Sequence, residues 1–164
     1  MNNKNMLFID ITKEVFTKFR SKKIKVDRVN LNKKTPKLLR KSLKLRCIDV
    51  WDDEGIMAEL YSLESPNYSL ESYNISFTAS PKHADWILVV WAVTKNMEKA
   101  LIDAYSVIPE PKVIIACGDK AINWDNRFSG VVWSVKDVLG HVDLEIPGNP
   151  SSKDIFNYLV NFVK

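Results

Sequence analysis

Trp86-Ile87-Leu88-Val89-Val90-Trp91-Ala92-Val93 is the stretch of sequence that decides the fold. This apolar run is far shorter than the roughly 20 residues that a membrane-spanning helix needs, but it has the length of one strand. It lacks the alternation of a strand with one solvated face. Such a run is typical of a strand that is buried on both faces, as in a parallel sheet covered by helices on each side.

Further strands and helices are predicted to alternate around this run. Short apolar or alternating segments predict strands over 43–51, 73–77, 113–116 and 142–146, with a weaker candidate at 131–133. Apolar residues at helical spacing predict helices over 54–63 and 95–107 and a last helix capped by Ser151 or Ser152. This alternation predicts a doubly wound α/β domain with a mainly parallel sheet.

The charge is unevenly distributed along the 164 residues. Residues 1–46 hold 15 Lys and Arg against 3 Asp and Glu, a net charge of +12, whereas residues 47–164 hold 9 against 17, a net charge of −8. We therefore divide the chain into a basic N-terminal extension, residues 1–40, which is partly helical, and an α/β domain, residues 41–164. A basic arm can contact an acidic partner, an anionic lipid surface or nucleic acid, and nucleic acid is the least favoured of the three.

Several classes of protein find no support in the sequence. The N-terminus lacks the apolar core and cleavage site of a signal peptide, which predicts a cytoplasmic protein. Cys47 and Cys117 are too few for a disulfide framework or a four-ligand metal site, and both are expected to be buried and reduced. There is no glycine-rich dinucleotide or P-loop motif. The acidic run 52–54 could bind Mg²⁺, but a capped, solvated helix start is the favoured interpretation.

Ligands of doubly wound domains bind at the carboxyl ends of the strands. The loops expected at that edge are 51–55, 117–121 and 147–150. Any chemistry of this domain is therefore expected in these three loops.

An ordered set of short motifs points to a known family. Ser80-Pro81-Lys82-His83-Ala84-Asp85 precedes the apolar strand, and Val93-Thr94, 108–112, Gly118, 142–144 and 147–150 follow in order. The set resembles the iron–sulfur small subunit of energy-converting nickel–iron hydrogenases and the homologous subunit of respiratory complex I, NADH:quinone oxidoreductase. The resemblance covers roughly residues 40–164. It implies a flavodoxin-like fold, docking on a large catalytic subunit near membrane-arm subunits, and a four-iron cluster held by four cysteines.

The four positions that carry cysteine in the resembled family carry other residues here: Asp52, Gly55, Lys120 and Asn149. Thiolates hold the iron of such clusters, whereas these side chains offer oxygen, an ammonium or nothing. We therefore predict that the cluster is absent and that no other cofactor replaces it. Our hypothesis is that an ion pair between Lys120 and Asp52, with hydrogen bonds from Asn149, fills the emptied volume.

The other residues that the resemblance singles out have supporting roles in it. Ser80, Pro81, His83, Asp85, Pro147 and Gly148 are expected to stabilise the fold or contact the large subunit, and no catalytic residue is expected. Trp91 stands where the resembled family has a small residue.

The predicted function is that of a cluster-less structural subunit, peripheral on the inner face of the cell membrane within a hydrogenase-like or complex I-like assembly. One alternative is electron transfer through an unusual centre that uses Cys47, Cys117 and the acidic loop. The other is a stand-alone module that binds a small ligand or nucleic acid.

Overall fold

The computed structural model describes residues 42–50, 54–124 and 132–163. The basic extension and the expected helix caps Asp52 and Asp53 lie outside these residues. Parallel strands form a single sheet: β1 (Leu43–Asp49), β2 (Ile75–Phe77), β3 (Trp86–Val90), β5 (Val113–Cys117) and β7 (Leu144–Ile146). Their order, β2-β1-β3-β5-β7, is that of flavodoxin-like folds, so the predicted fold class is confirmed.

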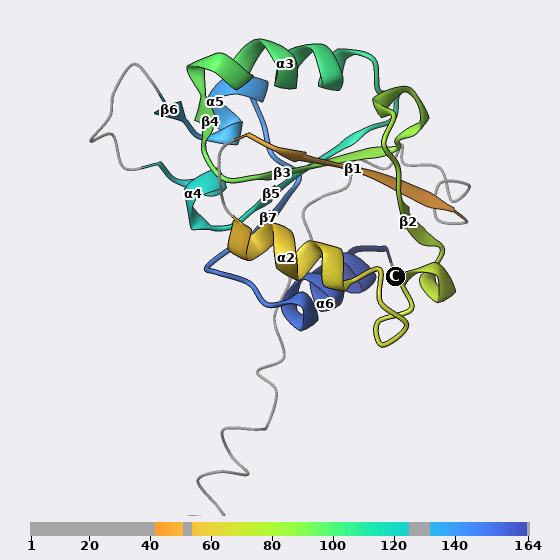
Figure 1. Cartoon of the computed structure of the whole chain (residues 1–164). Coiled ribbons are helices and arrows are strands. Elements are labelled where there is room, and N and C mark those ends of the chain that lie inside the picture. Colours follow the sequence, from red (N-terminus) through yellow and green to blue (C-terminus); the bar gives the residue numbers. More distant parts are fainter. Residues whose placement is uncertain (1–41, 51–53, 125–131, 164) are drawn as a thin grey trace, which may run out of the picture.

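Helices cover both faces of the sheet (Figure 1). One face carries α3 (Lys95–Ser106) and α5 (Val135–Leu139), and the other carries α2 (Glu54–Ser62) and α6 (Ser152–Val163). The shorter elements are η2 (Leu70–Tyr73), η3 (Pro81–His83), β4 (Val93–Thr94), α4 (Asp119–Ile122) and β6 (Val132–Trp133). In the described part of the chain, no helix is long and apolar enough to cross a membrane.

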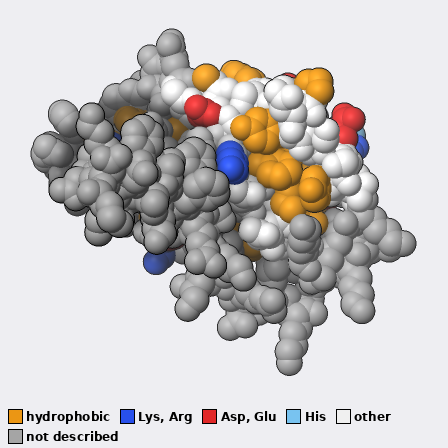
Figure 2. Space-filling view, turned by 90° about the horizontal axis from the view of Figure 1, so that it is seen from below, with side chains coloured by type: hydrophobic (Ala, Val, Ile, Leu, Met, Phe, Trp, Pro, Cys, Tyr) orange, Lys and Arg blue, Asp and Glu red, His pale blue; other side chains and the backbone are white. Residues whose placement is uncertain are grey.

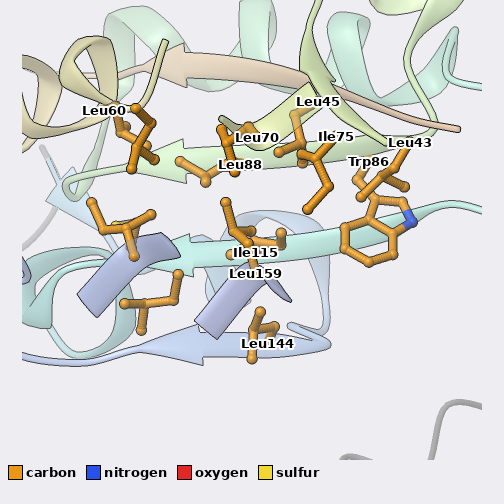
Figure 3. Close-up of a cluster of buried hydrophobic side chains, with 14 of the residues drawn as sticks. Leu43, Leu45, Leu60, Leu70, Ile75, Trp86, Leu88, Ile115, Leu144 and Leu159 are labelled. Carbon is orange, nitrogen blue, oxygen red and sulfur yellow. The ribbon is translucent and has the colours of Figure 1, made fainter. Parts of the chain in front are cut away.

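The central strand β3 explains why its sequence is continuously apolar. All five of its residues are buried, and they divide between two cores. Leu88 and Val90 pack in the cluster that lies toward α2 and α6, part of which Figure 3 shows. Ile87 and Val89 pack in the cluster that lies toward α3 and α5. A strand between two helical layers has no solvated face, so it carries no alternation.

The expected strand over 86–93 is wrong at its end. β3 ends at Val90, and Trp91 follows in the left-handed region with φ +74°. Val93 and Thr94 belong instead to a two-stranded antiparallel ribbon, in which they pair with Trp133 and Val132. Glycine is the residue that normally indicates a turn with positive φ. Here the turn falls on an aromatic residue, so the apolar pattern continues and the end of the strand cannot be seen in the sequence.

Glu59 joins α2 to the start of α6. Its Oε2 accepts hydrogen bonds from the backbone N–H of Ser152, at 2.7 Å, and from the Ser152 hydroxyl. Ser151, one residue earlier, forms a second cap by exchanging hydrogen bonds with Asp154. The predicted capping of the last helix is therefore confirmed, and an acidic side chain from a neighbouring helix reinforces it.

This contact predicts a pH dependence of stability. The hydrogen bonds from the side chain and then the backbone of Ser152 lower the pKa of Glu59 below its ordinary value of about 4.3. The resulting stabilisation is fully present above the ordinary pKa and is lost as the pH falls through the lowered one. We expect Glu59→Gln to lower the urea midpoint at pH 7 and to change it less at pH 3. A Glu98→Gln variant is the control, and equal pH profiles for wild type and Glu59→Gln would contradict this contact.

Candidate functional site

The carboxyl edge of the sheet brings two of the predicted loops into direct contact. The turns after β5 and β7 are joined by backbone hydrogen bonds from Gly118 N–H to the Ile146 carbonyl, at 2.8 Å, and from Asp119 N–H to the Gly148 carbonyl, at 3.0 Å. In return, the Gly148 N–H donates to Oδ1 of Asp119 at 2.5 Å. The expectation that 117–121 and 147–150 meet at this edge is therefore confirmed. In Figure 1, α4 and the start of α2 lie together at this edge.

Gly118 allows the first turn of α2 to approach the same place. Its backbone has φ +95°, and a Cβ atom there would lie 2.7 Å from Cδ1 of Ile56. Only glycine combines this conformation with so close a contact. Gly55, the residue before Ile56, is exposed and belongs to the same first turn. The structure therefore gathers Gly55, Lys120 and Asn149 at one edge.

Lys120 is held by aromatic rings. Its Nζ lies 5.2 Å from the ring centre of Trp124 and 5.9 Å from that of Trp91, both within the range of cation–π attraction. Among the residues that the structure describes, no carboxylate forms an ion pair with Lys120. Asp52 lies outside them, so the expected Lys120–Asp52 pair stays a prediction. The two ring contacts were not expected, because residues 91, 120 and 124 meet only in the folded chain.

Asn149 lies in the turn after β7 and is exposed. Within residues 42–50, 54–124 and 132–163, its side chain does not form the hydrogen bonds that were expected. Pro147 and Gly148 shape this turn, and Gly148 takes φ +83°. The hydrogen bonds between Gly148 and Asp119 hold the β7 turn against the β5 turn.

The side chains at this edge do not fit a four-iron cluster. Gly55 has no donor atom, the Lys120 ammonium faces two rings, and Asn149 offers a neutral amide, whereas cluster iron requires thiolates. No group of three or more His, Cys, Asp or Glu converges anywhere in the described ranges. The misfit thus follows from the chemistry of these three side chains.

Neither cysteine compensates for the missing ligands. Cys117 is fully buried in the core at the end of β5. Cys47 lies on β1 and is half-buried, not fully buried as expected. Its partial burial, followed by the nearby Asp49 charge, raises the pKa of its thiol to about 12. Its Sγ is 3.8 Å from Sδ of Met57. A thiol with this pKa stays protonated at neutral pH, so it is neither a good nucleophile nor a good metal ligand.

A hollow of about 260 Å³ lies beside Cys47, and sequence patterns gave no sign of it. Its lining comes from β1, α2 and the end of β2: Arg46, Cys47, Met57, Leu60, Tyr61, Glu64, Phe77, Thr78 and Ala79. The lining mixes apolar side chains with one acidic and one basic residue.

The motif 80–85 lies at the opposite, amino-terminal edge of the sheet. Pro81 and His83 belong to the 3-10 turn η3, which Ser80 precedes, and His83 is exposed there. Asp85 accepts a hydrogen bond from Lys44 N–H at 2.8 Å and donates its own N–H to the Lys44 carbonyl at 2.9 Å. This exchange clips the start of β3 to β1. The resembled motifs therefore fall into two groups at opposite ends of the strands.

Asp143 makes the same exchange of hydrogen bonds between the start of β7 and the neighbouring strand β5. It accepts from Ile114 N–H at 2.8 Å and donates its N–H to the Ile114 carbonyl at 2.9 Å. His141 Nε2 lies 3.7 Å from the same carboxylate. An aspartate directly before a strand thus fixes the neighbouring parallel strand in register.

Comparisons with known proteins agree with this fold. Residues 54–162 match the family described as NADH ubiquinone oxidoreductase, 20 Kd subunit. Formate hydrogenlyase subunit 7 of Escherichia coli is 31% identical over 117 residues, which cover 70% of this chain and 45% of that protein. An uncharacterized protein of Methanocaldococcus jannaschii is 30% identical over 111 residues, covering 68% of this chain and 75% of that protein. The chain thus spans less than half of the formate hydrogenlyase subunit.

A chain in the structure of the membrane-bound sulfane sulfur reductase, an archaeal respiratory membrane complex, superposes with a TM-score of 0.61. The two sequences are 23% identical, and the match covers 77% of this chain and 72% of that one. At this identity the likeness shows a shared fold.

Proposed function

The chain belongs to the family of the NADH ubiquinone oxidoreductase 20 kDa subunit, and from this membership we propose that it is a structural subunit of a hydrogenase-like or complex I-like redox assembly. In this proposal the chain docks on the large subunit and carries no four-iron cluster. The observation that carries it is the occupation of three cluster-ligand positions by Gly55, Lys120 and Asn149. A domain that keeps the fold of its family but lacks thiolate donors keeps the shape needed for docking and loses the means of holding iron.

The bonding at the carboxyl edge supports a role without a metal. The turns after β5 and β7 are joined by three hydrogen bonds between protein groups, two of them made by Asp119. The first turn of α2 packs on Gly118 through Ile56. Contacts within the chain therefore hold these segments together.

The face that carries α2 and α6 supports contact with a partner. Figure 2 shows hydrophobic side chains gathered on this face. Tyr61 of α2 is 66% exposed, and Tyr73, whose ring packs edge-on against Phe156 at 5.3 Å, is 38% exposed. Aromatic side chains on a rigid surface are typical of subunit interfaces. We assign this face to a neighbouring subunit of the assembly.

Membrane association is part of the proposal and rests on two observations. A structural relative comes from a complex described as membrane-bound, and residues 1–46 carry the net charge of +12, from 15 basic and 3 acidic residues. In the proposal the chain is peripheral on the inner face of the cell membrane. Its basic extension contacts an acidic partner surface or anionic head groups there.

Deletion of residues 1–35 tests the contribution of the extension. We expect the shortened chain to fold but to capture less of the large subunit when it is purified by affinity from its native cells. The loss should be smaller at high ionic strength, because salt already screens the charged contacts that the extension makes in the full chain. A Lys99→Glu variant, altered on the exposed side of α3, is the control. Unchanged capture would show that the extension does not hold the partner, and binding to vesicles of anionic lipid would then test the alternative.

The alternative of electron transfer through an unusual centre receives no support from the two cysteines. Cys117 is enclosed in the core, and the Cys47 thiol, with its pKa raised to about 12 by burial, favours the protonated form. Holding iron at either would require the core to open or the thiol to ionise.

A further inference from the structure

Trp91 occupies a central position at the carboxyl edge. It follows β3, the strand that lies between β1 and β5 in the sheet. The turn after β5 carries the third of the cluster-ligand positions, Lys120. The Trp91 side chain is half-buried and packs against the core cluster on the side of α2 and α6. Its ring centre lies 5.9 Å from the Lys120 ammonium, so the ring is next to the β5 turn.

The backbone at Trp91 is strained. Its φ of +74° is in the left-handed region, which glycine adopts freely and a bulky residue rarely enters. A tryptophan there is unfavourable unless its ring makes contacts that outweigh the strain. The indole Nε1 is buried and has no hydrogen-bond partner among the described residues, so apolar packing and ring contacts are what the side chain contributes.

Lys120 links this ring to the next loop. Its ammonium lies 5.9 Å from the ring centre of Trp91 and 5.2 Å from that of Trp124. Lys120 stands at the third ligand position, so the residue that replaced a thiolate is directed toward the ring that replaced a small residue. Two changes distant in the sequence thus meet at one place in the fold.

We propose that the Trp91 ring fills the space beside the ligand positions Gly55, Lys120 and Asn149 and, with the Lys120 ammonium near its face, excludes a four-iron cluster by volume. This inference rests on the proposed function. It adds a second reason, besides the missing cysteines, why this edge cannot accept a four-iron cluster. A ring and a cluster cannot occupy the same space, so restoring thiolates without removing the ring leaves no room for iron. Trp91 is then the residue that determines which group this edge can accept.

The test uses the full chain with cysteines at the three described ligand positions: Gly55→Cys, Lys120→Cys and Asn149→Cys. One version keeps Trp91 and the other carries Trp91→Gly. Each is incubated without oxygen with a synthetic four-iron, four-sulfide cluster that carries four alkanethiolate ligands. Each cysteine thiol passes its proton to the thiolate it displaces, one synthetic thiolate remains, and the iron does not change oxidation state.

The readouts are iron and acid-labile sulfide per chain and the visible absorbance after gel filtration. We expect the Trp91→Gly version to retain the cluster and the version with Trp91 to lose it. Equal retention by both versions, or no retention by the Trp91→Gly version, would overturn the proposal. Iron in the unmodified chain would instead refute the proposed function, so the two failures are distinguishable.

A second measurement needs no iron and no new cysteine. Lys120→Met is introduced into the wild-type chain and into Trp91→Gly, and the shift of the urea midpoint is compared. We expect Lys120→Met to lower the midpoint more when Trp91 is present, because only then does the substitution remove the contact between the ammonium and the Trp91 ring. Lys99→Met, on an exposed part of α3, is the matched control and should shift neither midpoint. Equal shifts in both backgrounds would show that Lys120 does not depend on Trp91 and would overturn this part of the proposal.

Discussion

Gly118→Ala is expected to lower the free energy of unfolding by about 2–4 kcal/mol, which is the sum of backbone strain and overpacking. The strain arises because φ at Gly118 is +95°. The overpacking arises because the new Cβ would lie 2.7 Å from Cδ1 of Ile56, so this buried side chain would have to shift within the core. Urea denaturation followed by circular dichroism measures the loss.

Gly140→Ala is the matched control for this prediction. Gly140 ends α5 with φ +82°, but a Cβ there would meet nothing within 4 Å. Its expected cost is therefore backbone strain alone, about 1 kcal/mol. Gly118 also has ψ 150°, a conformation almost confined to glycine, whereas Gly140 has ψ −24° in the αL region. Similar losses for the two variants would mean that neither this conformation nor the contact with Ile56 adds to the cost at Gly118.

Leu88→Ala is expected to lower the free energy of unfolding by about 3–4 kcal/mol, within the range measured when large core side chains are truncated. Leu88 is fully buried at the middle of the central strand, in the cluster shown in Figure 3. Neighbouring strands fix its backbone on both sides, through Cys47 and Ile115, so the surrounding chain can collapse little into the cavity. Thermal and urea unfolding both measure this change.

Ile102→Ala controls for the loss of a branched side chain in general. Ile102 lies on α3 and is 42% exposed, so its truncation is expected to cost under about 1 kcal/mol. If Leu88→Ala were equally mild, β3 would not be the buried centre of the sheet.

The main features of the fold could be predicted from the sequence because they depend on patterns within single segments. The apolar run of β3 indicates burial on both faces, and the spacing of apolar residues in α3 and α6 indicates helices. The end of β3 could not be predicted in this way, because Trp91 turns the chain without any break in apolar character. The short helices α4 and α5 were missed because four or five residues hold too little periodicity.

The candidate site was predictable in part. The positions Gly55, Lys120 and Asn149 followed from the family resemblance, and the parallel sheet then placed their loops at one edge. The contact of Lys120 with two rings could not be predicted, since it depends on how the turns after β3 and β5 approach each other. The separation of Ser80–Asp85 from Pro147 and Gly148 was predictable, because the first segment precedes a strand and the second follows one, which are opposite edges of a parallel sheet.

The central claim is that this member of the family holds no four-iron cluster, and the amounts of iron and acid-labile sulfide in the chain test it most directly. The chain is purified without oxygen in complex with its native partners and then separated from them, and its visible spectrum is recorded. We predict no iron, no sulfide and no cluster absorbance in the separated chain. About four irons and four sulfides per chain, the content of one such cluster, would contradict the account and make the chain an electron carrier.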